Sequence, residues 1–172
     1  MSTYTLVIHG GAGTILKKDL TNELEAAYRK GLEDALKAGY ALLEKGKTAV
    51  EAVLAATISL ENNILFNAGK GSVFGKDGRQ EMDASIMDGK NLMAGAVSAV
   101  RNVRNPVELA HAIMNKSQHV MLNGNGALEF AKEHGLQIEE DEYFYSAFRY
   151  EQWKQMQGSN EVVLDHNVVI KD

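Results

Sequence analysis

Two Asp-Gly pairs constrain the fold of this chain more than any other feature. Asp77-Gly78 and Asp88-Gly89 are typical of tight turns between strands, and residues 81–87 between them have the pattern of a strand. The second pair leads into residues 91–100, a nearly continuous apolar run lined with small side chains. Such a run predicts a strand that is buried on both faces. We therefore expect antiparallel strands at the centre of the chain.

Helical patterns precede and follow these strands. Residues 21–45 carry apolar or small residues at helical spacing, and Gly31 and Gly39 on that stripe indicate close packing against another element. Residues 48–51 form a capping box that opens a second helix. Further helices are predicted from Asn105-Pro106 to about Asn115, from the glycines at 124 and 126 to near 135, and over 140–157, with a short strand at 120–122. The inner face of the second helix is expected to hold Val50, Val53, Leu54, Thr57 and Ile58.

Because helices lie on both sides of the strands in the sequence, we predict an α+β fold with strands between helical layers. The length of 172 residues favours a single domain. The net charge of −5, with Lys and Arg scattered, argues against nucleic acids and anionic membranes as partners. The complete lack of cysteine excludes disulfides, thiolate catalysis and cysteine-based zinc sites.

The N-terminal residues bear on the cellular location of the protein and contain its first glycine-rich loop. Residues 4–8 are strand-like, with no charged segment and no long apolar segment around them, so no signal peptide is expected and the cytoplasm is the predicted location. The loop His9–Gly13 follows, but Leu16 stands where a dinucleotide-binding motif needs its third glycine. No serine lies in a G-x-S-x-G motif, the nucleophile elbow of α/β-hydrolases, so that class of enzyme is excluded.

Residues 60–72 predict a functional site. An acidic, amide-rich helix end runs into a loop of small residues with one large apolar anchor, Phe66. Gly69 and Gly71 allow a close backbone approach or a positive φ. Asp83 lies within an apolar strand, where a buried acid needs a partner, so we favour a structural hydrogen-bond anchor over a catalytic acid. From the residues alone, no complete catalytic set emerges.

Six motifs occur in order along the chain: His9–Gly13, Phe66–Ser72, Met82–Gly89, Gly95-Ala96-Val97, Asn105-Pro106 and His119–Gly124. Together they resemble the plant-type L-asparaginase/isoaspartyl peptidase family, and specifically its α subunit. The similarity covers about residues 4–135. The family is one of N-terminal nucleophile hydrolases, so the resemblance implies an αββα sandwich that a β subunit completes.

The resemblance also implies how the enzyme is made. A precursor would cut itself before a threonine, whose hydroxyl becomes the nucleophile and whose amino group becomes the base. Residues 1–157 would then be the α-subunit half of one domain, and 158–172 a flexible linker before the cleavage site. The only Gly-Thr pair is Gly13-Thr14 in the first loop, so the nucleophile is expected on the β subunit. Activity would require that subunit, in an (αβ)2 assembly.

The resemblance assigns roles to the residues around 60–70. It implies a structural sodium ion and no organic cofactor. Asn67 would face the threonine, although a loop-stabilising amide is the alternative, and Gly10 and Gly11 would border the site. The substrates would be asparagine or isoaspartyl dipeptides. The sodium ligands would be the backbone carbonyls of Leu60, Glu61, Asn63, Phe66, Ala68 and Lys70.

Two other functions remain open at this point. One is a glycosylasparaginase-like amidase, a secreted or lysosomal class that the missing signal and cysteines disfavour. The other is a non-catalytic subunit that uses its glycine loops only to bind a partner.

Overall fold

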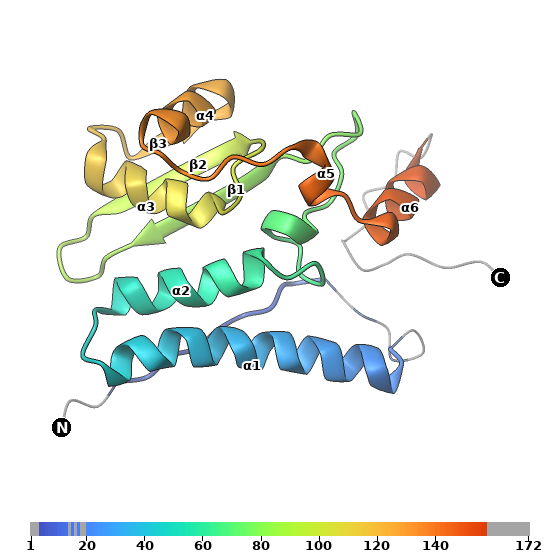
Figure 1. Cartoon of the computed structure of the whole chain (residues 1–172), viewed down its shortest axis with the longest axis horizontal. Coiled ribbons are helices and arrows are strands. Elements are labelled where there is room, and N and C mark those ends of the chain that lie inside the picture. Colours follow the sequence, from blue (N-terminus) through green and yellow to red (C-terminus); the bar gives the residue numbers. More distant parts are fainter. Residues whose placement is uncertain (1–3, 14, 16, 18–19, 158–172) are drawn as a thin grey trace.

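The computed structural model describes residues 4–13, 15, 17 and 20–157 (Figure 1). A pair of long helices lies below a small sheet, two helices cover one face of that sheet, and two short helices follow. The elements are α1 (Asn22–Glu44), α2 (Ala49–Glu61), the 3₁₀ turn η2 (Gly69–Gly71), β1 (Met82–Met87), β2 (Ala94–Val100), α3 (Pro106–Lys116), β3 (Met121–Asn123), α4 (Gly124–Glu133), α5 (Asp141–Phe144) and α6 (Ala147–Met156).

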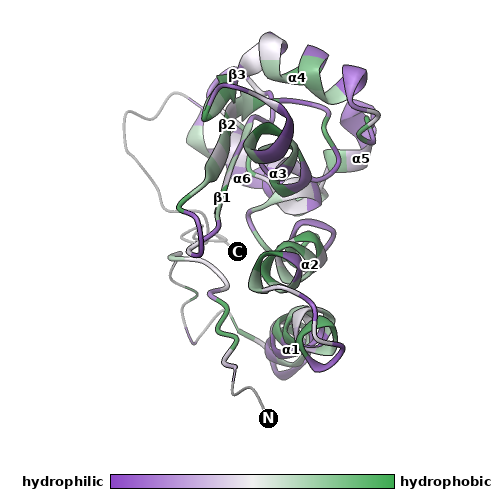
Figure 2. Cartoon of the chain, turned by 90° about the vertical axis from the view of Figure 1, so that its left-hand side faces the viewer, coloured by the Kyte–Doolittle hydropathy of each residue, from purple (hydrophilic) through white to green (hydrophobic). Residues whose placement is uncertain are grey.

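The first two helices form where the sequence predicts them. Thr21 caps α1 by accepting a hydrogen bond from the Leu24 N–H at 3.2 Å. Both halves of the capping box at Thr48 and Glu51 are present at the start of α2. Figure 2 views the two helices nearly end-on and shows α2 between α1 and the sheet with its covering helices.

Small residues set the distance between α1 and α2. A Cβ added at Gly39 would lie 2.7 Å from the carbonyl oxygen of Ala52, so the close packing predicted for the glycine stripe is confirmed. Ala52 and Ala56 are buried there. Val53 is exposed, and its predicted place on the inner face is wrong because α2 meets α1 through its alanines. The other side of α2, with Val50, Leu54 and Ile58, packs against a second cluster beneath the sheet.

The central sheet has the order β1-β2-β3. β1 and β2 are antiparallel, with Ile86 opposite Gly95, and β3 lies parallel to β2. The predicted hairpin at Asp88 is confirmed, closed by a hydrogen bond from the Asp88 N–H to the Met93 carbonyl at 2.9 Å. The turn at Asp77-Gly78 also forms, through the Gly75 N–H and the Arg79 carbonyl at 2.7 Å, but it joins no two strands of the described chain.

A bulge between Met82 and Ala84 explains Asp83. The carboxylate accepts a hydrogen bond from the Ala99 N–H at 2.8 Å, and Ala99 has a φ of 49°. The predicted role as a hydrogen-bond anchor is therefore confirmed. The predicted burial is wrong, because β1 turns Met82 and Ile86 inward and leaves Asp83 exposed.

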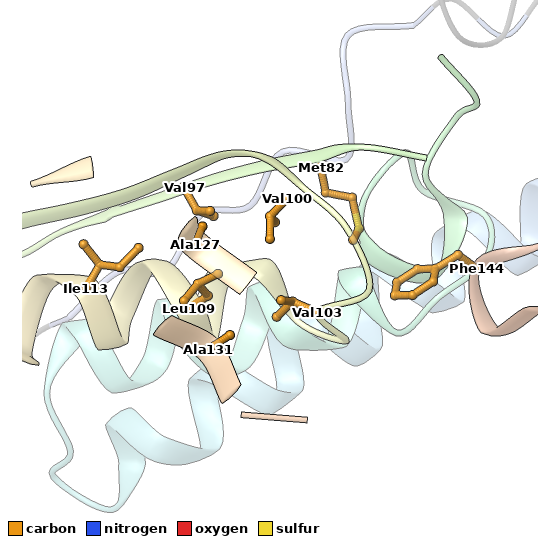
Figure 3. Packing of buried hydrophobic residues seen from close by; sticks show 9 residues of the cluster. All are labelled: Met82, Val97, Val100, Val103, Leu109, Ile113, Ala127, Ala131 and Phe144. Carbon is orange, nitrogen blue, oxygen red and sulfur yellow. The ribbon is translucent and has the colours of Figure 1, made fainter. Parts of the chain in front are cut away.

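The main core lies between one face of the sheet and the helices α3 and α4 (Figure 3). Gly95 lets α3 approach closely, since a Cβ there would contact the carbonyl oxygen of Ala110. The opposite face carries Met87 and Met121, both more than half exposed. The prediction that β2 is buried on both faces thus holds for one face only, because no described element covers the other. The core residues are Met82, Val97, Val100, Val103, Leu109, Ile113, Ala127, Ala131 and Phe144.

Two predicted elements differ in the structure. Residues 4–8 are not assigned as a strand, because they pair with no strand of the described chain and instead pack along α1, with Tyr4 5.4 Å from Tyr40 between ring centroids. The helix predicted over 140–157 is two helices, α5 and α6, because Ser146 starts a new helix by accepting a hydrogen bond from the Arg149 N–H at 3.4 Å. The predicted linker 158–172 and Thr14 lie outside the described residues.

Candidate functional site

The loop after α2 is held in a compact shape by its own backbone. The Asn63 N–H donates to the Leu60 carbonyl at 3.0 Å, and the Ala68 N–H donates to the Phe66 carbonyl at 2.9 Å. The Gly71 N–H then donates to the Ala68 carbonyl at 3.1 Å, which forms η2. These short-range bonds give the loop a defined main-chain geometry.

Phe66 anchors this loop to two other parts of the chain. Its ring packs edge-on against Tyr28 of α1, with centroids 5.8 Å apart, and only 4% of the residue is exposed. A Cβ added at Gly31 would lie 2.8 Å from this ring, and one added at Gly10 would lie 3.3 Å from it. The structure therefore brings the His9–Gly13 loop and the loop at 60–72 together. Next to Gly10, Gly11 has a φ of 125°, a backbone conformation that favours glycine.

The glycines of η2 let backbone carbonyls converge. A Cβ at Gly69, whose φ is 50°, would collide with the Glu61 carbonyl oxygen. A Cβ at Gly71 would collide with the carbonyl oxygens of Phe66 and Ile64. A carbonyl oxygen has two lone pairs, so one that accepts a backbone hydrogen bond still has one for a cation. This donor chemistry fits a hard cation, and it adds Ile64 to the carbonyls that surround the turn.

Asn67 is exposed, and its side chain closes the loop. The Oδ1 atom accepts a hydrogen bond from the Val73 N–H at 3.0 Å, across six residues. The amide oxygen thus stabilises the loop, which is the alternative role considered for this residue. Within the described chain the amide nitrogen of Asn67 has no hydrogen bond.

The side chain of Glu61 is a site feature that the sequence analysis missed. It is 3% exposed, and its oxygens accept from the Val107 N–H at 2.9 Å and from Asn105 Nδ2 at 3.1 Å. Burial raises the pKa of this carboxyl to about 7, while the two hydrogen bonds act in the opposite direction. Asn105 occupies the predicted N-cap position of α3, but its side chain binds Glu61 instead of its own helix. The only signal in the sequence is an acid directly after Leu60 at the end of a mostly apolar helix.

The helices α5 and α6 also contact this loop. The Tyr143 hydroxyl donates to Asn62 Oδ1 at 3.3 Å, and Lys70 Nζ lies 5.2 Å from the centroid of the same ring. Arg149, 1% exposed on α6, donates from Nε to the Gly71 carbonyl at 3.0 Å. Nothing in the sequence pattern of these helices indicated such contacts.

Other polar groups of the described residues pair with one another or cap helices. No group of three or more His, Asp or Glu side chains in the described residues could hold a metal ion. A hollow of about 370 Å³ is lined by Arg101 and Asp141, which pair with each other at 3.0 Å, and by Asn102, which also binds Asp141. His134 caps α4 through the Phe130 carbonyl. Among the helices described here, none is long and apolar enough to cross a membrane.

Comparison with known proteins identifies the family. The sequence model of the Asparaginase_2 family, described as "Asparaginase", matches residues 2–172. The chain belongs to this family. It is 50% identical over 131 residues to an isoaspartyl peptidase/L-asparaginase of Xenopus laevis, covering 76% of this chain and 41% of that protein. It is 40% identical over 167 residues to an isoaspartyl peptidase of Salmonella typhimurium, covering 97% and 53%.

The resemblance noted in the sequence is thereby confirmed. A third relative, an isoaspartyl peptidase/L-asparaginase of Danio rerio, is 43% identical over 149 residues, covering 87% of this chain and 46% of that protein. The chain spans about half the length of the curated relatives it matches. The mixed helix and sheet architecture is compatible with the family.

Proposed function

We propose that this chain is part of an enzyme that hydrolyses β-aspartyl amide bonds, in asparagine or in isoaspartyl dipeptides. The observation that carries the proposal is the contact between the Gly10 loop and the Phe66 loop in a chain of this family. Both motifs of the resemblance meet at one place, and the relatives named above are isoaspartyl peptidases or L-asparaginases.

We propose that the nucleophile is a threonine at the start of a second half, a β subunit released by self-cleavage of a precursor. Its hydroxyl oxygen would attack the amide carbonyl and its own amino group would take the proton. Ammonia or the amine of the second amino acid would leave with that proton, and water would then hydrolyse the acyl-enzyme to release aspartate. The half-length match to the relatives supports a second half. Asn67 would orient the hydroxyl or the water, beside Gly10 and Gly11.

The sheet supports the assembly that this mechanism needs. Met87 and Met121 leave an apolar face without a covering layer in the described chain. We propose that the sheet of the β subunit packs there, which would complete an αββα sandwich in an (αβ)2 enzyme. Residues 1–157 would be the α-subunit half and 158–172 a linker to the cleavage site. We propose the cytoplasm as its location, which cell fractionation would test.

We propose that a sodium ion binds the backbone carbonyls of the loop at 60–70. The convergence of the Glu61 and Phe66 carbonyls on the glycine turn supports it. The ion would supply positive charge that keeps these carbonyls together, while the chain's own residues position the reactants. Replacing sodium by choline should lower the melting temperature of the full-length protein and speed hydrogen exchange of residues 60–71; identical values in the two salts would contradict the ion. The proposed ligands are Leu60, Glu61, Asn63, Phe66, Ala68 and Lys70.

The direct test is to express the full reading frame and follow aspartate release from asparagine and from an isoaspartyl dipeptide. We expect release from at least one substrate, and two fragments of which the second begins with threonine by N-terminal sequencing. An intact protein that releases no aspartate refutes the proposal. A single active chain refutes the cleavage.

A pair of variants tests Asn67. Asn67→Ala should lower kcat while the protein stays folded and processed. Asn115→Ala is the matched control, because it also removes an amide that bonds to a backbone group, the His111 carbonyl at 2.8 Å on α3. Equal kcat values for the two variants would remove Asn67 from the active site.

A further inference from the structure

We propose that Arg149 is a positioning residue for the active-site loop, holding the end of the glycine turn so that Asn67 keeps one orientation. The expected effect of Arg149 on kcat rests on the proposed function. The support that Arg149 gives to the loop rests only on the contacts of the loop.

Arg149 reaches the loop from α6, 78 positions along the chain. Its Nε donates to the Gly71 carbonyl at 3.0 Å, and its Nη1 donates to Gln152 Oε1 at 3.0 Å. The residue is 1% exposed. A guanidinium in such a place is stable only when its donors are bonded, so these contacts hold it in a fixed position.

A second side chain fixes the next carbonyl of the loop. Gln80 Nε2 donates to the Ser72 carbonyl at 2.7 Å and to the Phe144 carbonyl at 2.8 Å. Phe144 ends α5, directly before the segment that carries Arg149. Two consecutive carbonyls, those of Gly71 and Ser72, are therefore tied to the segment 144–149.

The tie reaches Asn67 through the backbone. Residues 71 and 72 donate their N–H groups back to the carbonyls of Ala68 and Gly69, both at 3.1 Å. The next N–H along the chain, that of Val73, donates a hydrogen bond to Asn67 Oδ1. A displacement of Gly71 would therefore move both partners of the Asn67 hydrogen bond.

The loop needs this attachment because its other anchor is at the opposite end. Phe66 fixes the part before Asn67 to α1, whereas Arg149 fixes the part after it to α6. Between the two, Gly69 and Gly71 leave the backbone more freedom than other residues would. Removal of Arg149 takes away the side-chain bond to the Gly71 carbonyl, whereas Gln80 still holds the Ser72 carbonyl and Phe66 still anchors the other end of the loop.

Two variants of the full-length protein test the inference. Arg149→Met removes all donors at similar length, and Arg149→Lys keeps the charge without the planar donor fork. The control Ile113→Val trims a fully buried residue of the sheet core, in a cluster that includes none of residues 60–72. Each protein is measured by hydrogen exchange of the peptide 66–75 and by kcat and KM on both substrates.

We expect faster exchange at Gly71, Ser72 and Val73 in Arg149→Met, with a kcat lower by roughly 10- to 100-fold. Arg149→Lys should lie between this variant and the unaltered protein in both readouts. The control should keep the exchange of the loop and its kcat. Should Arg149→Met not fold, Arg149→Lys still decides the matter by the same readouts.

Two results overturn the inference. One is exchange of residues 71–73 unchanged in both Arg149 variants, which removes Arg149 as the support of the loop. The other is faster exchange with an unchanged kcat, which removes its effect on the reaction. An unaltered protein without β-aspartyl hydrolysis refutes the proposed function instead, and leaves the exchange readout to decide the structural part.

Discussion

Replacing Gly31 by alanine should destabilise the protein and disturb its active-site loop. Gly31 lies in the middle of α1, where alanine normally adds about 0.5–1 kcal/mol of stability. Here the new Cβ would lie 2.6 Å from Asn63 Nδ2 and 2.8 Å from the ring of Phe66. Neither neighbour moves freely, since Asn63 Oδ1 accepts from the Leu65 N–H at 3.0 Å and Phe66 packs on Tyr28.

Overpacking of this kind costs about 1–3 kcal/mol. After subtraction of the helical gain, we expect Gly31→Ala to lower the free energy of unfolding by up to about 2.5 kcal/mol. Because Phe66 must shift, kcat should fall as well. Urea unfolding of the full-length protein, followed by circular dichroism, measures the first effect, and aspartate release measures the second.

Gly126→Ala is the matched control for this substitution. Gly126 lies in the first turn of α4, and a Cβ there would meet nothing within 4 Å in the described chain. Alanine should therefore raise the free energy of unfolding by up to about 1 kcal/mol. If Gly31→Ala stabilises the protein as much as Gly126→Ala does, the reasoning from the close contact with Phe66 is wrong.

Substitutions at three further residues test single contacts by the change in urea midpoint. Thr48→Ala removes the capping box of α2 and should cost about 1 kcal/mol, and an unchanged midpoint would show that the cap adds nothing. Asp83→Ala should cost about 1 kcal/mol through the lost bond to Ala99, whereas Asp83→Asn, which keeps an acceptor, should cost less; equal losses would contradict the anchor role. Glu61→Ala leaves the buried Val107 N–H without its partner and should cost about 1–3 kcal/mol; a loss below that of Thr48→Ala would contradict its importance.

The features that the sequence predicted correctly arise from interactions between residues a few positions apart in the chain. The capping box at Thr48 needs only residues 48–51, and the hairpin at Asp88 needs only the residues around it. The Phe66 anchor and its glycines were also visible as a local pattern. Local structure of this kind can be recognised from the types of residue and their spacing in the sequence.

The features that were missed depend on contacts between distant residues. Glu61 meets Val107 across 46 positions and Arg149 meets Gly71 across 78, and no spacing rule relates such pairs. Asp83 looked buried because its strand is apolar, but β1 turns Met82 and Ile86 inward, and the partner of Asp83 is Ala99, 16 positions away on the neighbouring strand. The break between α5 and α6 carries no glycine or proline, so Ser146 was the only available sign.

The shape of the loop around the glycine turn depends little on which side chains the loop carries. The atoms that Gly69 and Gly71 approach include the main-chain oxygens of Glu61, Ile64 and Phe66, which every amino acid supplies. In a library of variants selected for activity, position 70 should therefore accept many residues, whereas 69 and 71 should accept glycine alone. During evolution the side chains on the surface of this loop can therefore change while the arrangement of its backbone oxygens is kept.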